Sequence, residues 1–242
     1  MTTPDDAAYR RALDQASGLY PGIRVGRPGR SRAYWPTVTL LRVLRLALAV
    51  RVVGARHVAP GPALLIGNHV SALDPVVVVM GTWWRVTAFT KIEWFAGRAA
   101  PFFRWMGQIP LRRGDESSTA WAMEMARLTL AAGGRIGLYP EGTRSPDPDE
   151  LHRLHKRVMV PLLQASEGVP VHALSTTYRS RPGRRRRVVV CVSPALDLDV
   201  RTLTADGLTD AVRDALLELS GQRYVDEYAR DVKRKLGARP GA

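Results

Sequence analysis

Short apolar runs that predict β-strands alternate with segments that predict helices over most of this 242-residue chain. Such alternation is typical of an α/β fold, in which helices cover the faces of a central sheet. We therefore expect a single α/β domain with a central mixed sheet flanked by helices. The expected strands are 63–67, 86–90, 108–111, 135–140, 169–178 and 187–193. The expected helices are about 5–17, a segment that begins near Ser71, 117–134, 150–166, 205–219 and 221–236.

The segment TVTLLRVLRLALAVRVV, residues 37–53, is the nearest approach to a membrane span. A span needs about 20 mainly apolar residues, whereas this run is shorter and contains three arginines. We predict a helix that lies at a membrane interface. A core helix whose arginines reach solvent is an equal alternative. The predicted division of the chain is an N-terminal part, 1–56, that ends with this interfacial segment, and a main domain, 57–242, that ends in C-terminal helices.

The chain is strongly basic, with 36 Lys and Arg against 22 Asp and Glu and a net charge of +14. Such a charge attracts anionic lipid, nucleic acid or a phosphorylated substrate. The densest run is RSRPGRRRR, residues 179–187. Because no aromatic side chains for base stacking are interleaved, anionic headgroups fit this run better than nucleic acid. A solvated loop remains an alternative.

Polar residues follow the apolar run ALLIG in the stretch GNHVSALDP, residues 67–75. Binding sites of open α/β folds lie beyond the carboxyl ends of the strands, where His69 would be placed. A carboxylate at Asp74 that accepts one ring N–H of His69 would leave the other ring nitrogen as a base. A His and an Asp five residues apart also occur by chance, and Ser71 or Asp74 can cap a following helix.

Two further strand ends carry polar turns, in LYPEGTRSP (138–146) and MGQIPLRRGD (106–115). Glycine permits close backbone approach to a ligand, and the arginine fork matches the geometry of a phosphate. Each turn is also compatible with an ordinary charged surface. The three segments together offer a base, its orienting acid and phosphate ligands.

These segments, in this order, resemble the 1-acyl-glycerol-3-phosphate acyltransferase family of glycerolipid acyltransferases. NHVSALD (68–74) resembles the family's N-H-x-x-x-x-D block, and GQIPLRR (107–113) resembles the second block, which ends in a phosphate-binding arginine. YPEGTRS (139–145) resembles F-P-E-G-T-R-S, with Tyr139 in place of Phe, and VPVHA (169–173) resembles V-P-V-x-P. The resemblance makes 57–242 a catalytic domain.

The resemblance implies a general base at His69 and its orienting acid at Asp74. It implies acceptor phosphate and glycerol binding at Arg113, Glu141, Gly142, Thr143 and Arg144. The resemblance implies that the reaction needs neither a cofactor nor a metal, because the acyl donor is a substrate. Ser71 is an alternative nucleophile, but a role as helix cap is favoured.

The implied reaction is acyl transfer from acyl-CoA or acyl carrier protein to lysophosphatidic acid in phospholipid biosynthesis. The implied partners are that donor, a lyso-lipid and an anionic membrane surface, with no nucleic acid. The expected location is the cytoplasmic face of the cell membrane, as a peripheral or monotopic protein. Two alternatives stay open: the same chemistry on another lyso-lipid or hydroxylated lipid, and a non-catalytic basic protein that binds membrane or nucleic acid.

Overall fold

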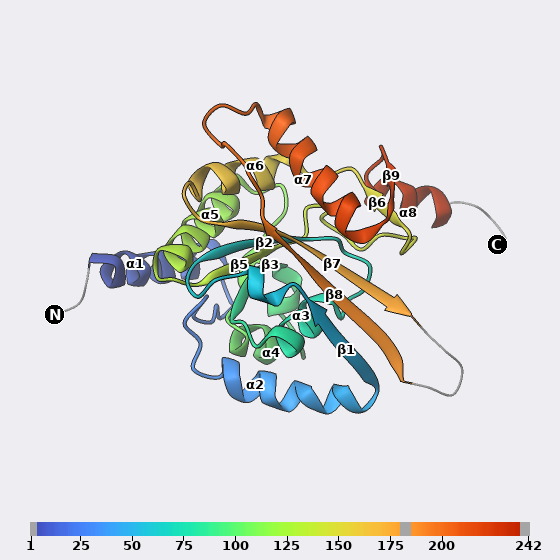
Figure 1. The fold of residues 1–242 in the computed structure, drawn as a ribbon. Helices are drawn as coiled ribbons and strands as arrows, with labels where there is room; N and C mark the ends of the chain where they lie inside the picture. The colour runs from blue at the N-terminus through green and yellow to red at the C-terminus, as the bar shows by residue number, and fades with distance from the viewer. Residues whose placement is uncertain (1–3, 180–184, 238–242) are drawn as a thin grey trace.

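The computed structural model describes residues 4–179 and 185–237, shown in Figure 1. Residues 180–184, the middle of the arginine-rich run 179–187 expected to face anionic headgroups, lie outside the described residues. The strands are β1 (Leu48–Val53), β2 (Ala63–Gly67), β3 (Val86–Lys91), β4 (Ile109–Leu111), β5 (Arg135–Leu138), β6 (Glu150–His152), β7 (Val171–Arg179), β8 (Arg186–Ala195) and β9 (Arg223–Val225).

Helices connect most of the strands and cover both faces of the sheet (Figure 1). The α-helices are α1 (Pro4–Leu19), α2 (Tyr34–Leu41), α3 (Asp74–Thr82), α4 (Ala100–Trp105), α5 (Glu116–Ala131), α6 (Lys156–Ala165), α7 (Ala205–Ser220) and α8 (Ala229–Gly237). The short 3-10 helices are η1 (Arg42–Leu46), η2 (Ala55–His57) and η3 (Ile92–Phe95).

The main sheet of the described residues has seven strands in the order β1-β8-β7-β2-β5-β3-β4. All neighbouring strands are parallel except β7 and β8, so the sheet is mixed, as predicted. Since β7, β2, β5, β3 and β4 run in one direction, their carboxyl ends share one edge. The turns that follow β2, β5 and β4 carry the first three sequence blocks, and that edge therefore brings the blocks together.

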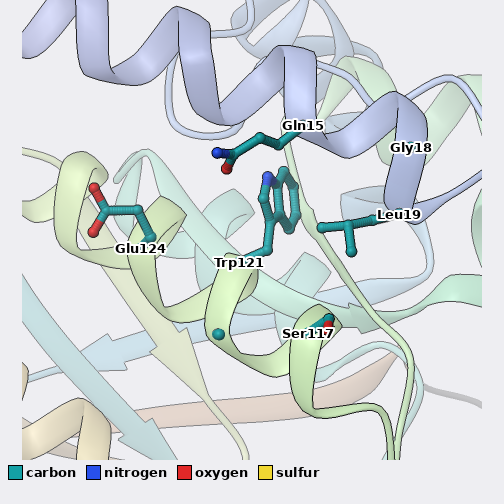
Figure 2. Close-up of a pocket in the computed structure, with 7 residues that line it drawn as sticks. Gln15, Gly18, Leu19, Ser117, Trp121 and Glu124 are labelled. Atoms are coloured by element: carbon teal, nitrogen blue, oxygen red, sulfur yellow. The ribbon is translucent and has the colours of Figure 1, made fainter.

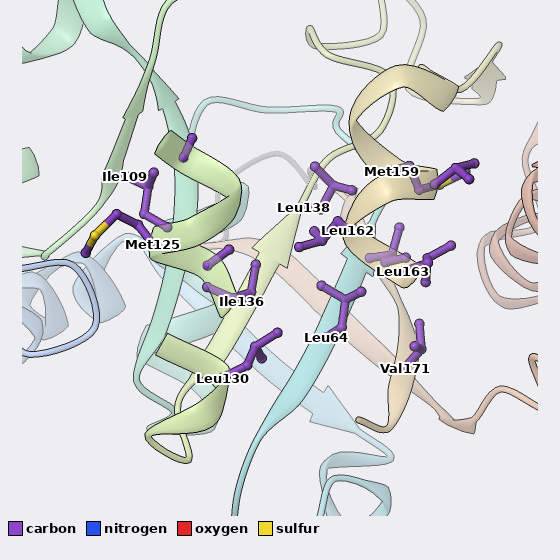
Figure 3. Close-up of a cluster of buried hydrophobic side chains, with 14 of the residues drawn as sticks. Leu64, Ile109, Met125, Leu130, Ile136, Leu138, Met159, Leu162, Leu163 and Val171 are labelled. Atoms are coloured by element: carbon purple, nitrogen blue, oxygen red, sulfur yellow. The ribbon is translucent and has the colours of Figure 1, made fainter. Parts of the chain in front are cut away.

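Each face of the sheet is packed against its own hydrophobic core. Leu64 and Ile66 of β2 belong to one core, whereas Ala63 and Leu65 belong to the other. This alternation follows from the period of two along a strand, and it makes β2 fully buried. Figure 3 shows Leu64 of β2 and Ile136 of β5 in the first core, beside residues of α5 and α6.

The helix predicted over 37–53 is wrong in its second half. The chain is helical through α2 and η1, but Leu48–Val53 forms edge strand β1, which runs parallel to β8 with Val50 opposite Val188. The β-branched Val50, Val52 and Val53 suit a pleated, half-buried strand better than a helix. Within the described residues, no helix has the length and apolar character needed to cross a membrane.

Two other predicted helices begin later than expected because short strands precede them. The 150–166 region contains β6 and then α6, and the 221–236 region contains β9 and then α8. Strands β6 and β9 pair with each other in parallel, with Leu151 opposite Tyr224. Each has only three residues and its partner is more than 70 residues away, so no local pattern marks it. The division of the chain at 56/57 remains a prediction, although β1 belongs to the main sheet.

Candidate active site

His69 and Asp74 are in direct contact in the turn after β2. The Nδ1 atom of His69 lies 2.9 Å from Oδ2 of Asp74, and the His69 side chain is 19% exposed while that of Asp74 is buried. A carboxylate that accepts the Nδ1 proton leaves Nε2 of the ring unprotonated. Within the described residues no hydrogen bond to Nε2 is present, so this atom can take a proton from a bound hydroxyl.

Four donors hold the Asp74 carboxylate in place. Besides His69, the backbone N–H groups of Val70 and Ser71 donate to Oδ2 at 2.8 Å each. The Tyr178 hydroxyl, at the end of β7, donates to Oδ1 at 2.8 Å. Burial, and then the charge of Asp74, raise the pKa of Tyr178, which keeps the phenol protonated as a donor. The acid therefore has a fixed orientation before any substrate binds.

Tyr139 supports the other side of the His69 ring. The two rings stack with centroids 4.6 Å apart and an interplanar angle of 27°. Gly67 permits this stacking, since a Cβ atom there would lie 3.1 Å from the Tyr139 ring. The position that departs from the block's usual Phe thus keeps an aromatic face against the histidine.

Glu141 joins the first and third blocks through their backbones. Its Oε1 accepts the N–H of His69 at 2.9 Å and its Oε2 accepts the N–H of His152 at 3.1 Å. The N–H of Ser145 in turn donates to the carbonyl of His69 at 2.6 Å. The Glu141 side chain is fully buried, so in this arrangement it positions the turn that carries the base. Its predicted contact with the acceptor remains untested.

Burial raises the pKa of Glu141 from its ordinary 4.5 to about 7, against the opposing effect of the two N–H donors. Since the folded-state pKa lies above the unfolded one, the folded chain binds this proton more tightly. The resulting stabilisation is complete below about pH 4.5 and is lost as the pH rises to about 7. It amounts to about 3 kcal/mol. We therefore expect the Glu141 proton to contribute a decrease in the free energy of unfolding of the wild type between pH 4.5 and pH 7, measured by urea denaturation.

The matched variant is Glu141→Gln, which cannot titrate. The difference in unfolding free energy between the wild type and this variant should change by about 3 kcal/mol between pH 4.5 and pH 7. A difference that stays constant over this range would contradict the assigned pKa.

The turn after β5 brings Gly142 and Arg113 together. Gly142 has φ +68, which favours glycine, and an added Cβ would lie 2.7 Å from the His155 ring. The Arg113 guanidinium, which follows β4, donates to the Gly142 carbonyl. Neighbouring Arg112 instead pairs with Asp115 at 3.1 Å. Of the two arginines, only Arg113 therefore faces the third block.

Thr143 and Arg144 complete this turn, and Lys91 lies at the end of β3. Thr143 is half-buried, and the side chains of Arg144 and Lys91 are exposed. Burial lowers the pKa of Lys91, and the charges of Arg113 and Arg144 lower it further. Arg113 and Arg144, which were predicted to bind phosphate, are thus both close enough to Lys91 to affect its pKa. The sequence motifs did not identify this lysine. This local excess of positive charge suits an anionic group.

Several other predicted features have different places in the structure. Helix α3 begins at Asp74 rather than near Ser71, and Ser71 does not cap it: its Oγ accepts the Leu73 N–H at 3.2 Å. His152, in the region expected to be helical, is fully buried in strand β6. Within residues 4–179 and 185–237, no group of three or more His, Cys, Asp or Glu could hold a metal ion.

A hollow between α1 and α5 contains none of these residues. It is lined by Gln15, Gly18, Leu19, Ser117, Ala120, Trp121 and Glu124. Figure 2 shows Trp121 beneath α1, where its Nε1 donates to the Ala12 carbonyl at 2.6 Å. The hollow is a gap in the packing between α1 and α5 and is separate from the candidate active site.

Comparison with known proteins gives a family and a fold. A family model described as Acyltransferase matches residues 49–177. Among solved structures, the chain is similar to the crystal structure of the 1-acyl-sn-glycerophosphate (LPA) acyltransferase PlsC from Thermotoga maritima. The TM-score is 0.54 at 19% sequence identity, over 97% of this chain and 90% of that one. This likeness confirms the predicted α/β fold. No curated protein sequence matches the chain.

Proposed function

The chain belongs to the acyltransferase family, and on that premise we propose that it acylates lysophosphatidic acid in phospholipid biosynthesis. A fatty acyl group would pass from the thioester of CoA or acyl carrier protein to the free hydroxyl of 1-acyl-sn-glycerol-3-phosphate, giving phosphatidic acid. Family membership confirms the predicted resemblance and makes the chain an enzyme, so the non-catalytic alternative is set aside.

The observation that carries the proposal is the 2.9 Å contact between His69 and Asp74, in a turn that Glu141 links to the turn where Arg113 donates to a backbone carbonyl. His69 takes the proton of the acceptor hydroxyl, and the oxygen attacks the thioester carbonyl. The tetrahedral intermediate collapses with cleavage of the C–S bond, and the thiolate recovers the proton from His69. Arg113 and Arg144 hold the acceptor phosphate and so orient its hydroxyl. No covalent acyl-enzyme is required.

We also place the enzyme at the cytoplasmic face of the membrane, on an anionic surface. Large apolar side chains are exposed on α2, η1 and the end of α3: Trp35, Leu40, Val43, Leu46 and Trp83. The Arg42 guanidinium lies over the Trp83 ring, 4.6 Å from its centroid. Exposed aromatic and aliphatic side chains beside arginine suit a lipid interface with acidic headgroups.

One assay tests the proposal. Purified protein is mixed with acyl-CoA and lysophosphatidic acid in vesicles, and thiol release is followed. Turnover should be faster when the acceptor is presented in anionic vesicles than in neutral ones. Replacing the acceptor by 1-monoacylglycerol, which has no phosphate, should lower kcat/KM by about tenfold or more. Equal use of both acceptors would favour the alternative hydroxylated lipid, and no turnover with either would defeat the proposal.

A further inference from the structure

The C-terminal segment 221–237 lies against the turns that carry the active site. The Gln222 side chain accepts from Nδ2 of Asn68, the neighbour of His69, at 3.0 Å. The same side chain donates to the carbonyls of Pro148 and Glu150 at 2.9 and 3.2 Å. With the pairing of β9 and β6, these contacts fix the segment beside the first and third blocks.

Ring stacking places the beginning of α8 next to the third block. The rings of Tyr228 and His155 stack with centroids 4.5 Å apart and an interplanar angle of 7°. His155 is itself packed against Gly142, whose carbonyl accepts from Arg113, and its N–H donates to the Pro140 carbonyl at 2.8 Å. A single aromatic ring therefore separates the first turn of α8 from the predicted phosphate-binding turn.

The first two turns of α8, which the Tyr228–His155 stacking holds beside the third block, contain two cations within electrostatic range of the site, Arg230 and Lys233. They are three residues apart and so lie on one face of the helix. The charge of Arg230 lowers the pKa values of Arg113 and Lys91, after the effect of burial on each. Burial lowers the pKa of Lys233, and Arg144 lowers it further. The two α8 residues thus extend the cationic group formed by Lys91, Arg113 and Arg144.

These five cations form no close ion pairs, although, against the effect of burial, the charge of Glu93 raises the pKa values of Lys91 and Arg113 and that of Glu141 raises the pKa of Lys233. In the part of the chain that the structure describes, none of the five lies within 4.0 Å of a carboxylate oxygen. On the same helix, by contrast, Arg234 pairs with Asp231 at 3.4 Å and Lys235 pairs with Glu227. Five cations with no directly paired carboxylate carry an excess of positive charge, which a bound anion stabilises.

We propose that Arg230 and Lys233 of α8 bind the phosphate monoester of the acceptor lipid, together with Arg113 and Arg144. The inference rests on the proposed function for the identity of that acceptor. It assigns part of the substrate site to a helix outside the matched sequence blocks. The alternative is that these residues bind a phosphate group of the acyl donor. Measuring KM for the donor and for the acceptor separately distinguishes the two possibilities.

The test compares Arg230→Gln/Lys233→Gln with the control Arg234→Gln/Lys235→Gln, which removes the same charge from α8 at exposed residues that are paired with Asp231 and Glu227. The first variant should raise KM for lysophosphatidic acid by about tenfold or more, with kcat within about threefold of the wild type. KM for acyl-CoA should not change, and the control should match the wild type. A rise in KM for acyl-CoA instead of the acceptor would overturn the assignment.

A binding measurement that needs no turnover accompanies the assay. Glycerol 3-phosphate should raise the Tm of the wild type and the control, but not that of Arg230→Gln/Lys233→Gln. If the wild type shows this protection, the variant loses it and lysophosphatidic acid is not acylated, the proposed function fails while α8 still binds a phosphate monoester. If the wild type acylates it and the variant retains both KM and protection, the α8 site fails alone. Without protection in the wild type, the α8 site fails regardless of turnover.

Discussion

Replacing His69 by alanine is expected to lower kcat for acyl transfer by roughly 10²–10⁴-fold, because general base catalysis by a positioned side chain contributes that much. The ring is the group that can accept the acceptor's proton, and its Nδ1 is already held 2.9 Å from Asp74. KM for the acceptor should change little, since the cations that hold its phosphate are untouched. Thiol release from acyl-CoA with lysophosphatidic acid measures both quantities.

The matched control for this variant is His57→Ala. His57 hydrogen-bonds the Val192 carbonyl at 3.0 Å and is not among the residues of the acyl-transfer site. Its removal should leave kcat close to the wild-type value. Full activity in His69→Ala would defeat the proposed mechanism, as would a trapped acyl ester on Ser71 combined with loss of turnover in Ser71→Ala.

Two substitutions of Asp74 should separate its charge from its structural role. Asp74→Ala leaves the half-buried N–H groups of Val70 and Ser71 and the Tyr178 hydroxyl without their acceptor. We expect the free energy of unfolding to fall by about 3–5 kcal/mol, which thermal or urea denaturation would measure. Turnover should be lost with it, because the orientation of the His69 ring is lost.

Asp74→Asn should keep the fold and lose activity. Its amide oxygen can stay with the two backbone donors and the Nδ1–H of His69, while its NH₂ group donates to the Tyr178 hydroxyl oxygen. The missing feature is the negative charge that stabilises the imidazolium during proton transfer. We expect kcat to fall by roughly a hundredfold or more, with an unfolding free energy close to that of the wild type. Wild-type kcat in this variant would contradict a role for the charge.

The sequence was sufficient to predict how the first three blocks meet. Each block follows an apolar run, and parallel strands present their carboxyl ends at one edge, so the turns after β2, β5 and β4 had to lie at the same edge. The spacing of His69 and Asp74 alone left a chance pair and a helix cap as alternatives, and the order of the blocks favoured the contact that the structure shows. What these residues do in catalysis stays a prediction that the variants above test.

The residues that complete the site could not be predicted, because their partners are remote in sequence. Tyr178 contacts Asp74 across 104 positions and Gln222 contacts Asn68 across 154. A tyrosine near a strand end and a glutamine near a helix end have many possible roles, and neither has a local spacing that marks it. Strand β1 was also missed, because its pairing partner β8 lies more than 130 residues further along the chain.

The attachment of the C-terminal segment has a consequence for how the enzyme loses function under stress. Strands β6 and β9 form a separate sheet of three-residue strands, whereas His69 and Asp74 follow a fully buried strand of the main sheet. Small peripheral units open locally at lower free energy than the core. Detachment of β9 and α8 would withdraw Arg230 and Lys233 and leave the His69–Asp74 pair assembled. Recognition of the acceptor would then be the first property to fail in mild denaturant, before the capacity for proton transfer.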